Sequence, residues 1–122
     1  MSDQRASGDA GEIAAEQFLQ RAGLRTVARN VSYRCGELDR ILIDGDTLVF
    51  AEVRLRSGGG FGGARDSVGP RKQRRLIAAA QCYLQAHPAL ARMPCRFDVL
   101  ALSGPLTAIE IEWIRDAFRV GD

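Results

Sequence analysis

Residues 36–54 read GELDRILIDGDTLVFAEVR, with two aliphatic, β-branched runs on either side of a short Gly/Asp turn. Such runs around a turn predict an antiparallel β-hairpin. With the turn centred on Gly45 and Asp46, Asp39 lies directly opposite Glu52. A turn centred one residue earlier changes the pairs but keeps both carboxylates on one face. Cβ atoms of opposed residues lie about 5 Å apart, where like charges repel each other. The hairpin therefore needs a positive group between its carboxylates, and a divalent metal ion is the obvious candidate.

Length and composition set the class of protein. The chain has 122 residues, of which 46% are hydrophobic and 26% charged, as expected for one soluble globular domain. No apolar run approaches the roughly 20 residues that span a bilayer, and the N-terminus lacks the hydrophobic region of a signal peptide. Cys35, Cys82 and Cys95 form no C-x-x-C pattern, so neither a disulfide framework nor a zinc site is expected. We expect a cytoplasmic protein without a membrane partner.

Hydrophobic periodicity outside the hairpin predicts one domain over residues 9–120, after a disordered tail over residues 1–8. A helical stripe begins after Asp9, which is a candidate N-cap, and ends at Gly23. The other expected elements are a strand at 24–33, the hairpin at 36–56, a helix that starts at Pro70 and ends before His87-Pro88, strands at 96–102 and 108–113, and a short helical tail. This α-β-β-β-α-β-β order predicts an α/β fold with a mixed β-sheet flanked by helices.

Basic residues gather around the glycine-rich segment 57–63 and the start of the second helix. They are Arg54, Arg56, Arg65, Arg71, Lys72, Arg74 and Arg75. A rim of this kind favours nucleic acid as the partner, with contacts to the phosphate backbone that tolerate many sequences and depend on salt. Phe61 is the best candidate for stacking on a base. The alternative is a solvated helix start, although positive charge there opposes the helix dipole.

Several segments together carry a resemblance to a known family. They are Gly11-Glu12 with Ala15 and Phe18-Leu19, Arg29-Asn30, Gly36-Glu37-Leu38-Asp39, Val49-Phe50-Ala51-Glu52-Val53-Arg54, Pro70-Arg71-Lys72-Gln73 and Arg96-Phe97-Asp98-Val99. Over about residues 8–118, the chain resembles the YraN family of bacterial proteins, which is placed in the restriction-endonuclease-like PD-(D/E)XK nuclease superfamily. The resemblance implies a restriction-endonuclease-like core and a metal-dependent nuclease, with active-site carboxylates at Glu12, Asp39 and Glu52. The third motif residue, normally lysine, falls on Arg54.

The chemistry of phosphodiester hydrolysis explains why paired carboxylates suit such a site. Mg²⁺ binds one or two carboxylates together with water and substrate oxygens, and it neutralises the charge that develops on the phosphate. Asp39 and Glu52 are the expected ligands of Mg²⁺ or Mn²⁺, with the backbone carbonyl of Val53 as a further ligand. The alternative is a pair of solvated carboxylates, one of them neutralised by Arg54 or Arg40.

Glu12 has two interpretations. The segment Asp9-Ala10-Gly11-Glu12 fits a capping box, in which a glutamate in the first helical turn reaches back to the backbone N–H of the cap residue. Such a glutamate also gains from the helix dipole. The family resemblance instead implies that Glu12 faces the metal, directly or through a water molecule.

Arg54 and Lys72 bear on whether the site can cut. Arginine keeps its proton at any working pH, so Arg54 can contact the scissile phosphate but cannot act as the general base. Lys72 is the only lysine among 17 basic residues, and it lies one helical turn before Leu76, at the edge of the apolar stripe. We hypothesise that Lys72 replaces or assists the missing motif lysine. The alternative is that Lys72 is an ordinary member of the basic cluster and that genomic base composition favours arginine elsewhere.

The sequence and the resemblance together predict a Mg²⁺-dependent endonuclease-like hydrolase that acts on nucleic acid, with DNA as the expected substrate and little sequence specificity. Two alternatives stay open. One is a nucleic-acid-binding pseudonuclease that does not cut, and the other is an interaction module in a DNA-processing complex. Trp113 and Phe118 are expected to anchor the last elements, and an exposed apolar strip near the C-terminus would suit a homodimer contact.

Overall fold

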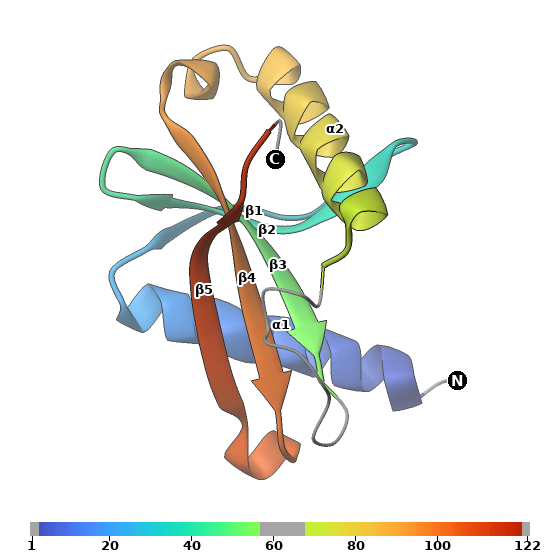
Figure 1. The fold of residues 1–122 in the computed structure, drawn as a ribbon. Coiled ribbons are helices and arrows are strands. Elements are labelled where there is room, and N and C mark those ends of the chain that lie inside the picture. Colours follow the sequence, from blue (N-terminus) through green and yellow to red (C-terminus); the bar gives the residue numbers. More distant parts are fainter. Residues whose placement is uncertain (1–2, 57–67, 121–122) are drawn as a thin grey trace.

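The computed structural model describes the backbone of residues 3–56 and 68–120, and within these ranges the side chains from Asp9 onward. The elements follow the predicted α-β-β-β-α-β-β order, with two short 3-10 helices added (Figure 1). They are α1 (Asp3–Arg21), β1 (Arg25–Tyr33), β2 (Gly36–Asp44), β3 (Thr47–Leu55), α2 (Pro70–Ala86), η2 (Leu90–Arg92), β4 (Cys95–Ser103), η3 (Leu106–Ala108) and β5 (Glu110–Phe118). No helix within the described residues combines the length and apolar character that crossing a bilayer requires.

The five strands form one mixed sheet in the order β1-β2-β3-β4-β5. Neighbouring strands are antiparallel except β3 and β4, which are parallel. The chain between these two strands includes α2, because parallel neighbours need a long crossover connection. The two long helices lie on different sides of the sheet (Figure 1). The predicted α/β class and mixed sheet are confirmed, and the arrangement is consistent with a restriction-endonuclease-like fold.

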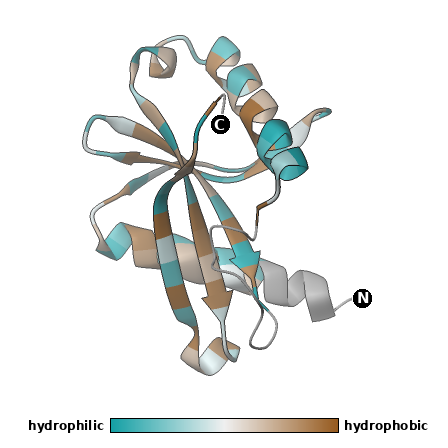
Figure 2. Cartoon of the chain, in the orientation of Figure 1, coloured by the Kyte–Doolittle hydropathy of each residue, from teal (hydrophilic) through white to brown (hydrophobic). Residues whose placement is uncertain are grey.

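Each face of the sheet has its own hydrophobic core. One core joins α2 to side chains that include Leu48 and Phe50, and the other joins α1 to side chains that include Val49 and Ala51. Successive side chains of β3 therefore alternate between the α2 face and the α1 face. In Figure 2 much of the sheet is coloured as hydrophobic, whereas the start of α2 is strongly hydrophilic. By the same alternation, Glu52 lies on the α2 face.

The hairpin has the register that the sequence predicts. Asp44 pairs with Thr47, and the ladder between β2 and β3 continues to the pair Arg40–Ala51. The next positions along the two strands are Asp39 and Glu52, where the ladder ends. The two carboxylates thus lie at the point where β2 and β3 begin to separate.

Two expectations about the ends of elements are wrong. α1 begins at Asp3, so Asp9 lies inside the helix instead of capping it. The expected helical tail is a continuation of β5, which extends to Phe118. Pairing with β4 and the stacking of Phe118 on Phe97, with ring centroids 4.9 Å apart, favour the extended backbone there.

Both outer strands are irregular. β1 has a register shift between Thr26 and Ala28, and β4 and β5 shift their pairing between Phe97 and Val99. Each outer strand also contains a non-glycine residue with a left-handed backbone, Asn30 and Asp116, both with φ of 52°. Such residues are uncommon and are often found at functional or strained positions.

Candidate functional site

The site centres on a buried carboxylate, Glu52 in β3, which is only 5% exposed. Burial, and after it the negative charge of Asp39 in β2, raises the pKa of Glu52 from 4.5 to about 8. The Oε1 atom of Glu52 is a buried oxygen without a hydrogen-bond partner among the described residues. An orphaned buried acceptor is costly, so this oxygen favours a ligand that supplies positive charge.

Asp39 reaches across the opening between the two strands. Its Oδ2 atom accepts a hydrogen bond of 2.9 Å from the backbone N–H of Val53. The side chain therefore bridges β2 to β3 beyond the last ladder pair and stays close to Glu52. The strained Asn30 lies next to this point, because the β1–β2 pairs on either side are Arg29–Arg40 and Val31–Leu38.

Two cations contact the same oxygen of Glu52. Lys72 Nζ, from the first turn of α2, lies 3.4 Å from Glu52 Oε2, and Arg54 Nη1 lies 3.8 Å from it. Both side chains remain partly exposed, at 43% and 40%. The structure thus points Lys72 toward the sheet, as the hypothesis about the motif lysine requires.

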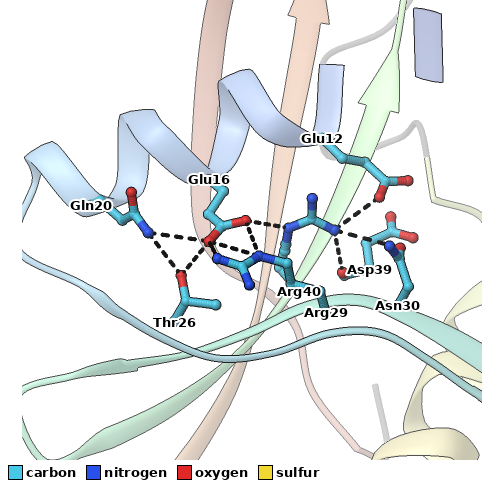
Figure 3. Close-up of polar contacts among 8 residues, drawn as sticks. All are labelled: Glu12, Glu16, Gln20, Thr26, Arg29, Asn30, Asp39 and Arg40. Carbon is cyan, nitrogen blue, oxygen red and sulfur yellow. Dashed lines mark hydrogen bonds and ion pairs between the residues drawn. The ribbon is translucent and has the colours of Figure 1, made fainter. Parts of the chain in front are cut away.

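Glu12 reaches the same region from α1. Its Oε1 atom accepts a 2.9 Å hydrogen bond from Arg40 Nη1, and the same nitrogen donates to the backbone carbonyl of Asp39 at 2.9 Å (Figure 3). Burial, followed by the charge of Asp39, raises the pKa of Glu12. The capping-box interpretation is wrong because α1 continues before Asp9. Glu12 instead contacts the Arg40 guanidinium, which also donates to the backbone carbonyl of Asp39.

Behind these residues is a polar network that the sequence analysis did not predict. The buried Arg40 donates through Nε to Glu16 Oε1 at 2.7 Å, and Glu16 Oε2 also accepts from Arg29 Nη2 at 2.6 Å and from the Thr26 hydroxyl at 2.7 Å. The hydrogen bonds from Arg29 are the largest cause that lowers the pKa of Glu16 to about 2. The spacing in the sequence gives one indication of this network, since Glu12 and Glu16, at i and i+4, share a helix face.

Not every buried carboxylate in the sheet resembles Glu52. Asp98 in β4 is fully buried, yet both of its oxygens are bonded. Oδ1 accepts from Arg96 Nε at 3.0 Å and from the backbone N–H of Asp116 at 2.9 Å, while Oδ2 accepts from Trp113 Nε1 at 2.9 Å. Asp98 is thus a satisfied structural group that ties β4 to β5.

The donor set fits a hard divalent cation in part. Carboxylate oxygens are the ligands that Mg²⁺ and Mn²⁺ prefer, and Mg²⁺ needs only one or two of them beside water and phosphate oxygens. Asp39 and Glu52 supply that number, and Oε1 of Glu52 is not occupied by a hydrogen bond from any described residue. Within the described residues, no group of three or more His, Cys, Asp or Glu side chains is arranged to hold a metal by itself. The metal ligation by Asp39, Glu52 and the Val53 carbonyl stays a prediction.

The other predicted basic residues are distributed unevenly. Arg71, Arg74 and Arg75 are exposed on the first turns of α2, beside Lys72. Arg56 forms an ion pair with Glu112, with 3.4 Å between Nη1 and Oε1. The segment that holds Phe61 and Arg65 lies outside the described residues. The exposed start of α2 is thus the part of the predicted rim that the structure places beside the acidic pair.

Comparisons with known proteins show which protein family the chain belongs to. The sequence model of the family described as "Uncharacterised protein family UPF0102" matches residues 11–102. A UPF0102 protein of Stutzerimonas stutzeri is 52% identical over 119 residues, which cover 98% of this chain and 99% of the relative. A UPF0102 protein of Xanthomonas campestris is 56% identical over 117 residues, with 94% and 93% covered, and one of Xylella fastidiosa is 49% identical over 122 residues, with 100% and 99% covered. The family model runs from Gly11 in α1 to Leu102 in β4 and includes the whole acidic site, so the chain belongs to the UPF0102 family, also called the YraN family.

Proposed function

We propose that this protein is a nuclease that hydrolyses phosphodiester bonds of nucleic acid with Mg²⁺ or Mn²⁺, and that its substrate is DNA read with little sequence specificity. One observation carries the proposal. Glu52 is buried with one oxygen orphaned, it lies beside a second carboxylate, and its other oxygen contacts Lys72 and Arg54. Buried acids with raised pKa values next to cations are typical of catalytic sites.

The residues divide into three roles. Asp39 and Glu52 would hold the metal, with the Val53 carbonyl as a further ligand, and the metal would orient water and neutralise the developing phosphate charge. Arg54 would contact the scissile phosphate through its fixed positive charge. Lys72 would orient the attacking water or donate a hydrogen bond to the phosphate. Glu12 would assist by holding a water molecule next to Asp39. The hydrogen bond from Arg40 would fix the orientation of the Glu12 side chain.

The exposed arginines at the start of α2 support nucleic acid as the substrate. Lys72 lies between Arg71 and Arg74 in the sequence, so a phosphate backbone that follows these arginines would pass beside the acidic pair. Contacts of this kind bind phosphate groups and not base edges. We therefore expect binding that tolerates many sequences and weakens steeply with salt.

Two alternative functions predict binding without cutting. A pseudonuclease would keep the arginines and the fold but lack a general base, and the arginine at the motif lysine position favours it. An interaction module in a DNA-processing complex would need neither metal nor cleavage. Metal-dependent cleavage separates the nuclease from both, and salt-dependent binding without cleavage supports the pseudonuclease.

The test uses purified protein on duplex, single-stranded and branched DNA and RNA with Mg²⁺, Mn²⁺ or EDTA. We expect cleavage with a divalent ion and none with EDTA. An Asp39→Asn variant, purified in parallel, should lose cleavage while it keeps the fold by circular dichroism. Cleavage that persists in this variant would refute the assignment of the site.

The role of Lys72 is tested with Lys72→Arg and Lys72→Met. If Lys72 acts in the reaction, Lys72→Met should lower the cleavage rate by about 10²-fold or more, a typical contribution of a positioned acid–base group. Arg71→Met is the matched control on the same helical turn. It should weaken binding but have little effect on the cleavage rate of bound substrate. Unchanged cleavage in both Lys72 variants would leave Lys72 as an ordinary member of the basic cluster.

A further inference from the structure

The turn between β1 and β2 packs closely on α2. A Cβ atom added to Gly36 would lie 2.6 Å from the backbone carbonyl oxygen of Arg75, so only glycine allows this approach. Beside it, Arg75 Nε donates to the backbone carbonyl of Cys35 at 3.3 Å. These two contacts fix the height and the orientation of the turn over the helix.

The same contact brings together two cysteines that lie 47 positions apart in the sequence. Arg75 and Cys82 lie seven positions apart on one face of α2, and both contact the turn. The Sγ atoms of Cys35 and Cys82 are 3.9 Å apart, and both thiols are free and half-buried. Disulfide sulfur atoms lie about 2 Å apart, so the two Sγ atoms must approach each other by about 2 Å to form the bond.

We propose that Cys35 and Cys82 are an oxidative modification site, a dithiol that closes to a reversible disulfide in response to a low-molecular-weight disulfide such as glutathione disulfide. The proposal does not depend on the proposed nuclease activity. Its basis is the packing of the turn on α2, which holds the two sulfur atoms together before any oxidant arrives.

The exchange takes place in two steps. The Cys35 thiolate attacks one sulfur of glutathione disulfide, which forms a mixed disulfide and releases one glutathione thiolate. The Cys82 thiolate then attacks the Cys35 sulfur and displaces the second glutathione. Two electrons pass from the dithiol to the oxidant, and the two thiol protons end on the glutathiones. The hydrogen bond to Cys35 and burial raise the pKa of Cys82, which suits the protected, second-reacting thiol.

Closure would join two elements that carry the acidic site. Cys35 precedes β2, which carries Asp39 four residues later, and Cys82 lies on α2, which carries Lys72 in its first turn. The bond would fix the β1–β2 turn to α2. It would thereby restrain the distance between Asp39 and Lys72. A crosslink over 47 positions also restricts the unfolded chain strongly.

The test is peptide mapping of the full-length protein. Reduced protein is incubated with glutathione disulfide, its remaining thiols are alkylated, and it is digested with trypsin without reduction. Cleavage after arginine places the three cysteines on separate peptides, residues 35–40, 76–92 and 93–96. We expect the first two peptides to be linked, with the mass of their sum less two hydrogens. The exposed Cys95 should carry glutathione.

Variants make the outcome decisive. Cys95→Ser should leave the linked peptide unchanged, and Cys35→Ser should convert Cys82 to a glutathione adduct or leave it as free thiol. In Cys95→Ser protein, oxidation should raise the melting temperature on the order of 10 °C relative to the reduced form. Separate glutathione adducts on Cys35 and Cys82 without the linked peptide would overturn the proposal.

Discussion

The burial of Glu52 should make the protein less stable as pH rises. In the unfolded chain a glutamate titrates near 4.5, whereas the folded state holds the pKa of Glu52 at about 8. Between these values the folded state keeps a proton that the unfolded state has lost, so the free energy of unfolding falls with pH and levels off above pH 8. The full pKa difference corresponds to at most about 5 kcal/mol. Because local relaxation around the ionised carboxylate relieves part of this cost, we expect a loss of about 3 kcal/mol.

The assay compares the wild type with Glu52→Gln by urea denaturation from pH 5 to pH 9. Glutamine has nearly the same shape and cannot ionise, so the difference between the two curves isolates the Glu52 carboxyl from groups that do not contact it. The variant should have similar stability to the wild type near pH 5 and exceed it by about 3 kcal/mol above pH 8. A ligand that binds only the folded state stabilises it. Millimolar Mg²⁺ at pH 8.5 should therefore stabilise the wild type and leave the variant unchanged.

Parallel curves would refute this reasoning. If the difference in stability between wild type and Glu52→Gln does not change with pH, then Glu52 is ionised in the folded protein as readily as in the unfolded chain. The side chain would then be hydrated or fully paired, and it would not need a bound cation.

Three further predictions concern the surroundings of the site. Arg40→Met removes the buried partner of two glutamates and should lower the free energy of unfolding by about 3 kcal/mol. Arg29→Met, at a side chain 57% exposed, should cost much less, because water screens its ion pair. Equal losses in denaturant titrations would contradict the assignment of Arg40 as the buried partner. Gly36→Ala should cost about 2 kcal/mol because of the clash with α2, while Gly69→Ala, with nothing within 4 Å of its Cβ, should cost less than about 1 kcal/mol. Equal melting temperatures of these two variants would show that the turn can move. Arg74→Gln should lower the slope of log affinity against log salt for DNA by about one, measured by fluorescence anisotropy; an unchanged slope would place Arg74 outside the DNA contact.

The sequence predicted the parts of the structure that depend on local pattern. The hairpin register follows from the Gly/Asp turn and from alternation along the two strands, so the adjacency of Asp39 and Glu52 could be predicted before the fold was known. The position of Lys72 at the edge of the apolar helical stripe likewise predicted that its side chain points toward the sheet. These inferences need only neighbours in sequence or across one turn.

Other features depend on packing between distant elements. The Arg40 network joins α1, β1 and β2, and no periodicity shows that a buried arginine will meet Glu16 there. The contact between Cys35 and Cys82 arises only when α2 packs on the β1–β2 turn. The last residues of β5 have a composition that does not decide between helix and strand, and pairing with β4 decides it. The sequence contains these residues but not the distances between them.

The irregular outer strands affect how the protein can assemble. β1 and β5 are the two open edges of the sheet, and an open edge can recruit a strand from another molecule. Each edge is interrupted by a register shift and by a left-handed residue, Asn30 or Asp116, which turns the local N–H and C=O groups out of line. Continuous strand addition is thereby disfavoured at both sides. A homodimer, if the protein forms one, should then associate through side-chain surfaces, and the fold should resist aggregation through edge-to-edge pairing.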